Sequence, residues 1–239
     1  MFHTLNESPK MAKKRTPSVK DQGPAIHEAP PSRDSIYRTL TEYQKEAWRM
    51  IDQRAITMLV GEAGSGKTHA AVAWAVNAIN RGLYEDLYLI RSPLEAGRAR
   101  LGFLPGDAGI EGKMAPWVAP ATGVLKKLKF EGKIKAIPPA FIQGITVDSV
   151  AIVDECQCLT LDEFEMVATR LGERGKMIFA GDPWQDTKNS AGMLPFMDIL
   201  AVIQERRIDV GVYHFPPEAN CRHPLVREIT TEFKKLRNR

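Results

Sequence analysis

The segment from Gly61 to Thr68, with the sequence GEAGSGKT, carries the residue types that bind phosphate groups. Its glycines let the backbone curl so that successive N–H groups face one anion, and Lys67 adds a positive charge for the β- and γ-phosphates. The hydroxyl of Thr68 is a ligand for Mg²⁺. The pattern GxxxxGK[ST] is complete. It predicts a site for ATP and Mg²⁺.

Two adjacent carboxylates, Asp154 and Glu155, follow the apolar run VAIV at 150–153. Continuous apolar runs are typical of strands covered on both faces, so this run would carry the acids to a strand end. We expect Asp154 to meet Mg²⁺ through water, and Glu155 to orient or deprotonate the attacking water. Such a pair favours hydrolysis of ATP over transfer of phosphate to a second small molecule.

Two glutamines are further candidates for the same site. Gln185 follows the apolar run at 176–180 in the sequence GDPWQ. It could hydrogen-bond the γ-phosphate or the attacking water, although GDxxQ also occurs in ordinary turns at strand ends. Gln44 precedes the phosphate loop on an expected helix. It could contact the adenine edge through both atoms of its amide, or it could be an exposed helix glutamine.

Strands and helices alternate along the chain and would position these residues. Apolar runs predict strands at 55–60, 87–91, 150–154 and 176–180, and helical spacing predicts helices at 41–52, 68–80, 162–171 and 193–203. This alternation indicates an α/β fold with a mostly parallel central sheet flanked by helices.

Residues 1–37 are basic and rich in proline, which predicts a disordered or loosely attached segment before a single domain at 38–239. No apolar run is long enough to cross a membrane, and the N-terminus lacks a secretory pattern, so we expect a cytoplasmic protein. The three cysteines form no CxxC arrays and are expected to be reduced thiols.

Basic residues gather in three segments, at 10–15, 126–135 and 234–239, while the net charge is +4. Such clusters attract nucleic-acid backbones, so we expect single-stranded RNA or DNA as a partner. The alternative is that these are solvated surfaces. Segment 126–135 is expected to be a solvated loop or a hairpin in a ring pore. Trp48, Trp117 and Trp184 are expected to pack rather than to stack on bases.

Five motifs together resemble the PhoH family of P-loop ATPases. They are GEAGSGKTHAA, RSPLEAGRARLGFLPGD, VAIVDECQ, MIFAGDPWQ and CRHPLV, and the resemblance spans roughly residues 40 to 230. That family is related to the single RecA-like motor core of superfamily 1 helicases. The resemblance implies a P-loop NTPase fold with one RecA-like domain.

The resemblance also implies roles for individual residues. Asp154 and Glu155 look like the Walker B pair of a DExQ signature, Gln185 like the glutamine of motif III, and Arg222 like the arginine of motif VI that contacts the γ-phosphate. Segment 91–107 looks like motif Ia, which faces nucleic acid in helicase relatives. The nucleotide-binding set is Gln44, Gly61, Glu62, Ala63, Gly64, Ser65, Gly66, Lys67, Thr68 and His69; the catalytic set is Lys67, Glu155, Gln185 and Arg222; the metal ligands are Thr68 and Asp154.

A single core supplies only half of a helicase motor, so a neighbouring copy would have to complete the site. Arg222 could act within its own chain or as a finger from a neighbour. We therefore expect a homo-oligomer, a hexameric ring with ATP at its interfaces. The expected function is ATP hydrolysis coupled to binding or remodelling of RNA or DNA. The alternative is an ATP-gated assembly or regulatory module with slow hydrolysis and no helicase activity.

Overall fold

The computed structural model describes residues 33–93, 109–185, 191–207 and 209–237. These residues form a sheet of six strands in the order β3-β2-β4-β5-β1-β6, and every strand pair is parallel. The strands are β1 (Ile56–Val60), β2 (Asp86–Ile90), β3 (Lys133–Ile137), β4 (Val150–Asp154), β5 (Lys176–Gly181) and β6 (Val210–His214). The α/β fold with a parallel sheet is confirmed.

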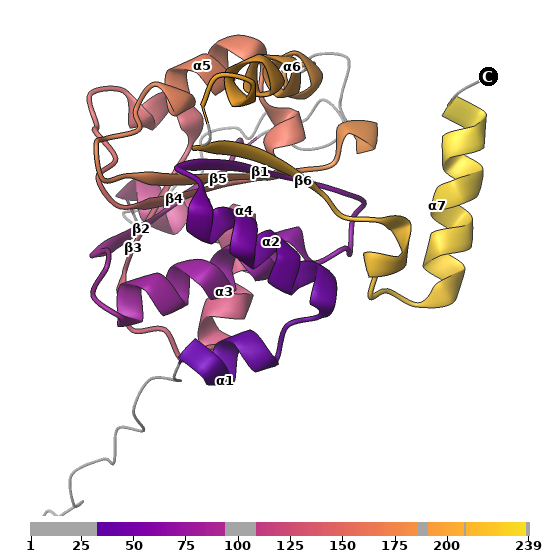
Figure 1. Cartoon of the computed structure of the whole chain (residues 1–239), viewed down its shortest axis with the longest axis horizontal. Coiled ribbons are helices and arrows are strands. Elements are labelled where there is room, and N and C mark those ends of the chain that lie inside the picture. The colour runs from indigo at the N-terminus through magenta and orange to yellow at the C-terminus, as the bar shows by residue number, and fades with distance from the viewer. Residues whose placement is uncertain (1–32, 94–108, 186–190, 208, 238–239) are drawn as a thin grey trace, which may run out of the picture.

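Helices cover both faces of the sheet (Figure 1). Helices α1 (Arg33–Arg38), α2 (Glu42–Gln53), α3 (Lys67–Asn80) and α4 (Gly109–Lys127) lie on one side, and α5 (Leu161–Ala168) and α6 (Met193–Gln204) lie on the other. Alternate strand residues point to opposite faces. Leu59 and Ile152 accordingly pack with α3, whereas Met58 and Val153 pack with α5 and α6.

The first two helices are firmly attached to the core. Thr41 caps α2 through a reciprocal capping box with Gln44, as the sequence predicts for a helix that starts there. Ile36 of α1 is 1% exposed, and the ring centroids of Tyr37 and Trp48 lie 5.6 Å apart in a T-shaped arrangement. The folded part therefore already includes α1, before residue 38. The prediction for residues 1–32 falls outside the described residues.

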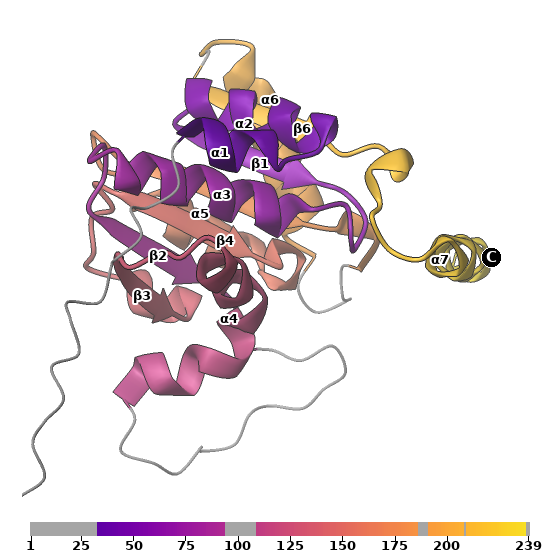
Figure 2. The same cartoon turned by 90° about the horizontal axis from the view of Figure 1, so that it is seen from below.

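Two strands and three helices were missed by the sequence patterns. The basic segment 126–135 is neither a loop nor a hairpin, because it comprises the end of α4, a turn and the start of edge strand β3. Strand β3 was not predicted because its sequence KIKAI alternates between lysine and apolar residues and contains no continuous apolar run. Helix α4 contains Pro116 and Pro120, which disguise its helical pattern, and Figure 2 shows that it is bent.

The last helix, α7 (Pro224–Arg237), stands apart from the body in both ribbon views (Figures 1 and 2). It follows a short 3-10 turn, η4 (Pro217–Ala219), and a loop that leads away from β6. Among the helices that the structure describes, none is long and apolar enough to cross a membrane.

Candidate nucleotide-binding site

The carboxyl ends of β1, β4 and β5 meet at one edge of the sheet, where parallel α/β proteins bind their ligands. The phosphate loop connects β1 to α3, and β5 lies between β1 and β4. The N–H of Gly61 donates to the carbonyl of Gly181 at 3.2 Å, which joins the start of the loop to the end of β5. The topology thus places the loop, the acidic pair and the GDPWQ segment around one site.

Two glycines of the loop occupy positions that a larger residue would strain. Gly64 and Gly66 have φ angles of +93° and +91°, in the left-handed region. A Cβ on Gly66 would lie 2.2 Å from Nε2 of Gln44, and one on Gly64 would lie 2.7 Å from Cγ of Arg222. The loop therefore curls tightly beneath two long polar side chains.

The loop fits a bound triphosphate on several grounds. Gly66 begins α3 without any side chain to cap the first N–H groups of the helix, which are left facing the site. The Ser65 hydroxyl is buried and has no hydrogen-bond partner among the described residues. Lys67 Nζ donates to the carbonyls of Gly61 and Glu62 at 2.7 and 2.9 Å, which holds its charge over the loop.

A magnesium ion also fits this donor set. Thr68 Oγ1 donates to Asp154 Oδ1 at 2.8 Å, so both expected ligands already meet across the site. No cluster of three or more His, Cys, Asp or Glu side chains suited to a metal occurs in the described ranges. Mg²⁺ is commonly held by one or two protein oxygens together with phosphates and water, and Thr68 and Asp154 supply two such oxygens.

Burial perturbs both charged groups at the centre of the site. Burial raises the pKa of Asp154, and the nearby charge of Glu155 raises it further. The hydrogen bond from Thr68 and the charge of Arg91 act in the opposite direction and lower it. Burial lowers the pKa of Lys67, against the charges of Asp182, Glu155 and Asp154. Each group would therefore gain from a partner of opposite charge, which Mg²⁺ and phosphate supply.

Glu155 is held in an unusual conformation at the edge of the site. Its φ of 50° and ψ of 44° lie in the left-handed region, which is uncommon for residues other than glycine. Its Oε2 accepts a hydrogen bond from Gln157 Nε2 at 2.5 Å, and its Oε1 lies 4.0 Å from Nη2 of Arg91. The side chain is 40% exposed, so water can reach it.

A chain of hydrogen bonds links Glu155 to Gln185. Gln157 accepts from the Asp182 N–H at 3.1 Å, and Asp182 Oδ2 accepts from Gln185 Nε2 at 2.9 Å. Gln157 was not among the predicted site residues, although the DECQ motif contains it. Only the fold shows that this glutamine joins the ends of β4 and β5.

Arg222 lies on the phosphate loop of its own chain. Its stem covers Gly64, the Cys221 N–H donates to the Gly64 carbonyl at 3.1 Å, and Asn220 Nδ2 donates to the Ala63 carbonyl at 3.3 Å. Asn220 Oδ1 accepts from the Arg222 N–H at 2.9 Å. The structure thus places Arg222 beside the phosphate loop of its own chain.

The two remaining candidates lie at different depths. Gln44 is buried, its Oε1 accepts from the Thr41 N–H at 3.0 Å, and its Nε2 faces Gly66. One side of its amide is thus already engaged in capping α2. His69 is half-buried in the first turn of α3, where burial and then the charge of Lys127 lower its pKa.

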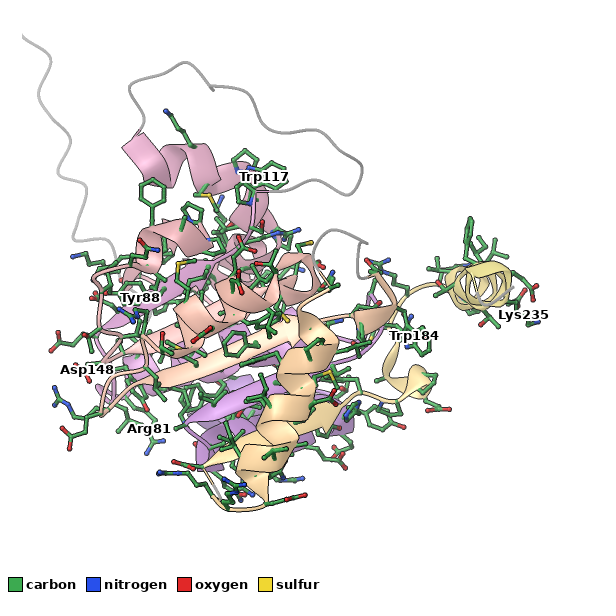
Figure 3. The ribbon with its side chains drawn as sticks, turned by 90° about the horizontal axis from the view of Figure 1, so that it is seen from above. Arg81, Tyr88, Trp117, Asp148, Trp184 and Lys235 are labelled. Atoms are coloured by element: carbon green, nitrogen blue, oxygen red, sulfur yellow. The ribbon has the colours of Figure 1, made fainter. Side chains whose placement is uncertain are left out.

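The remaining predictions concern the motif Ia segment and three tryptophans. Segment 94–108, with most of the motif Ia resemblance and all of LGFLPGD, is outside the described residues. Trp48 packs in the core and Trp117 is partly buried, as expected. Trp184 differs from the other two, because it is 56% exposed (Figure 3). It sits beside Gln185 in the 3-10 turn η3 (Pro183–Gln185).

Sequence comparison identifies relatives of this chain. The family model described as PhoH-like protein matches residues 36–234. A PhoH-like protein of Synechocystis is 33% identical over 86% of this chain and 65% of the relative. Protein PhoH of Escherichia coli is 33% identical over 84% of this chain and 59% of the relative. The chain thus spans less than two thirds of the length of these relatives.

Structure comparison supports the fold. The large terminase of a thermophilic bacteriophage, solved in complex with ADP, has a TM-score of 0.51 and 14% sequence identity. The match covers 80% of this chain and 49% of the terminase. The same terminase with ATP-gamma-S gives a TM-score of 0.51. At this identity the likeness concerns the fold alone.

Proposed function

The chain belongs to the PhoH family, and on this premise we propose that it binds ATP with Mg²⁺ and hydrolyses the nucleotide. One observation carries the proposal: the Thr68 hydroxyl and the Asp154 carboxylate meet at 2.8 Å beside a curled phosphate loop. Glu155 follows directly at the end of β4.

Each side chain then has a distinct task. Lys67 and the first N–H groups of α3 bind phosphate oxygens, while Thr68 and Asp154 hold Mg²⁺, which would neutralise developing charge on the phosphates. Glu155 accepts a proton from the attacking water, and Gln157 keeps its carboxylate in place. Gln185 and Arg222 contact the γ-phosphate, and Gln44 contacts adenine through its Nε2.

We further propose that ATP turnover is coupled to single-stranded RNA or DNA. Trp184 is 56% exposed and lies one residue from Gln185, and stacking of bases on aromatic side chains tolerates any sequence. Lys126, Lys127 and Lys129 are exposed and add positive charge at the end of α4. A base bound at Trp184 would thus alter the position of the neighbouring Gln185, which contacts the γ-phosphate in this proposal.

The second candidate is an ATP-gated assembly module, and the position of α7 favours it. This helix begins two residues after Arg222, whose stem lies on the phosphate loop. A change at the γ-phosphate could therefore alter where α7 points. In both candidates the chain forms a homo-oligomer, a hexameric ring, and in this one it hydrolyses ATP slowly and has no helicase activity.

Phosphate release in the presence and absence of poly(U) or single-stranded DNA separates the two candidates. Coupling predicts that the polymer raises kcat and that Trp184→Ala abolishes the increase while basal hydrolysis persists. Unchanged kcat with either polymer, together with an ATP-dependent increase in mass, would favour the assembly module.

The hydrolytic site is tested by two variants. Glu155→Gln should keep ATP binding and lose about 10²–10⁴-fold in kcat, because the proton acceptor is removed. Lys67→Ala should lose both ATP binding and hydrolysis, because the positive charge that binds the phosphates is removed. Fluorescent ATP binding and phosphate release measure the two effects separately, and wild-type turnover by Glu155→Gln would refute its assigned role.

A further inference from the structure

Arg91 lies directly after β2, beside the acidic pair at the end of β4. The two strands pair in parallel, with Ile90 opposite Val153. The next positions on the two strands, Arg91 and Asp154, therefore lie side by side at the carboxyl edge of the sheet. The Arg91 N–H also donates to the Ile137 carbonyl at the end of β3, at 3.4 Å. Strand register thus fixes where this arginine stands.

The guanidinium of Arg91 faces both carboxylates of the acidic pair. Its Nη1 lies 3.5 Å from Oδ2 of Asp154, and its Nη2 lies 4.0 Å from Oε1 of Glu155. The side chains of Arg91 and Asp154 are 20% and 8% exposed, so water screens this pair of charges only weakly. Because a guanidinium holds several N–H groups in fixed directions, one side chain can contact two carboxylates.

Each acid divides its two oxygens between a neutral donor and Arg91. Oδ1 of Asp154 accepts a hydrogen bond from Thr68 Oγ1 at 2.8 Å. Oε2 of Glu155 accepts one from Gln157 Nε2 at 2.5 Å. The other two oxygens, Oδ2 and Oε1, are those that face Arg91. A carboxylate contacted at both oxygens is restrained in rotation, so Arg91 completes the orientation of each group.

The charge of Arg91 also offsets repulsion within the pair. Burial and then the charge of Glu155 raise the pKa of Asp154, whereas the hydrogen bond from Thr68 and the charge of Arg91 lower it. Lys67 directs its Nζ to two carbonyls of the phosphate loop. The two cations therefore have separate places, Lys67 on the loop and Arg91 on the acids.

We propose that Arg91 is a positioning residue for ATP hydrolysis, which holds the carboxylate of Glu155 and is itself anchored by Asp154. The inference rests on the proposed hydrolysis and adds a residue from β2, outside the phosphate loop and the DECQ motif. Arg91 acts through Glu155 and does not contact the nucleotide. The orientation of the proton acceptor thus depends on the strand next to β4 as well as on Gln157.

Steady-state hydrolysis by the full chain, with ATP varied, tests this role. Arg91→Gln should lower kcat by about 10²-fold, since a small displacement of the base is sufficient for such a loss. The KM for ATP should change by less than about twofold, because binding of the ground state is untouched. Arg91→Lys keeps the charge but loses the fork of donors, so its kcat should lie between those of Arg91→Gln and wild type.

A control and a double variant make the test specific. Arg81→Gln removes the same charge from the exposed residue after α3, labelled in Figure 3, and should keep the wild-type kcat. In a chain that already carries Glu155→Gln, Arg91→Gln should lower the single-turnover rate by less than about threefold, because no carboxylate is left to position. A further 10²-fold loss there would overturn the proposal. Weaker binding of fluorescent ATP by Arg91→Gln would also overturn it, and would assign the arginine to the nucleotide.

Urea titration examines the same contact without any turnover. Arg91→Gln should lower the unfolding midpoint of wild type, because the buried charge of Asp154 loses its partner, and should leave the midpoint of Asp154→Asn unchanged. Equal shifts in both backgrounds would contradict the anchoring by Asp154.

Failure of this role and failure of the proposed function give different results. A wild type that hydrolyses ATP, with kcat unchanged in Arg91→Gln, would reject the role of Arg91 and leave the proposed function intact. A wild type that binds ATP without hydrolysing it would overturn the proposed hydrolysis and this role together, whatever the urea titration shows.

Discussion

At the scale of single residues, Glu155 and Asp154 differ in how the fold holds them. Glu155 is exposed to solvent and strained, with φ of 50°, and its carboxylate is steadied by Gln157. Asp154 is buried and bonded to Thr68, and burial raises its pKa. One carboxylate is thus accessible to water, while its neighbour is enclosed beside the Thr68 hydroxyl.

Gln157 should act by positioning Glu155 rather than by touching ATP. Gln157→Leu should lower kcat by about 10²-fold, since a small displacement of the base is sufficient for such a loss. The KM for ATP should stay unchanged, because the hydrogen bonds of Gln157 go to Glu155 and Asp182. Steady-state kinetics with ATP varied checks both values, and an equal rise in KM would contradict a positioning role.

The buried charge of Asp154 should lower the free energy of unfolding when neither magnesium nor nucleotide is bound. Asp154→Asn keeps an oxygen for Thr68 and removes a buried charge, so the melting temperature should rise by about 2–4 °C if the gain is about 1 kcal/mol. The folded-state pKa of Asp154 is raised, so wild type takes up a proton more readily when folded. The difference between variant and wild type should therefore shrink as the pH falls through that pKa.

At the scale of elements, α2 is attached to the sheet by a buried lysine. Lys176 Nζ of β5 donates to the carbonyls of Ile51 at 2.6 Å and of Arg54, and lies 5.1 Å from the ring centre of Trp74. These carbonyls belong to the end of α2, where helices leave acceptors unpaired. The other end of α2 carries Gln44 against the phosphate loop, so this lysine also supports the site.

Lys176→Met should remove the charged donor from these carbonyls, so that the Ile51 carbonyl keeps only the longer bond from the Arg54 N–H at 3.4 Å. The free energy of unfolding should fall by about 1–3 kcal/mol, which is the range for buried polar groups that lose a partner. Lys133→Met, on the exposed edge strand, is the matched control and should change stability by less than about 0.5 kcal/mol. Urea titration of both variants measures the difference, and equal midpoints would show that Lys176 contributes nothing.

At the scale of the whole molecule, the N-terminal boundary follows from packing. Ile36 and Tyr37 precede the expected start of the domain, yet Ile36 is buried and Tyr37 meets Trp48. Helix α7 differs, because its large apolar residues Leu225, Ile229 and Phe233 are 55%, 48% and 58% exposed. Among the described helices, α1 therefore completes the core, whereas α7 stands apart from it.

Shortened chains test this difference between the ends. A chain that begins at Arg33 should retain the stability of the full chain, whereas one that begins at Thr39 should lose about 2–5 kcal/mol, comparable to emptying one large core position. Thermal unfolding of the two chains checks the prediction. Equal melting temperatures would place α1 outside the cooperative unit.

The sequence alone determined the parts of this protein that depend on local chemistry. The glycine spacing of 61–68, the apolar strands and the acidic pair at 154–155 predict a parallel α/β fold and a phosphate site, because each depends on neighbouring residues. Strand β3 and helix α4 were not predicted, because an exposed edge strand and a helix interrupted by prolines lack the expected periodicity.

Only the tertiary structure decided which distant residues share the site. Thr68 and Asp154 are 86 positions apart in the sequence and meet because of the strand order, in which only β5 separates β1 from β4. No local pattern encodes that order. The same applies to Gln157 as the link between two strand ends and to Arg222 on its own phosphate loop. Long-range packing sets these distances, and it also leaves α7 uncovered.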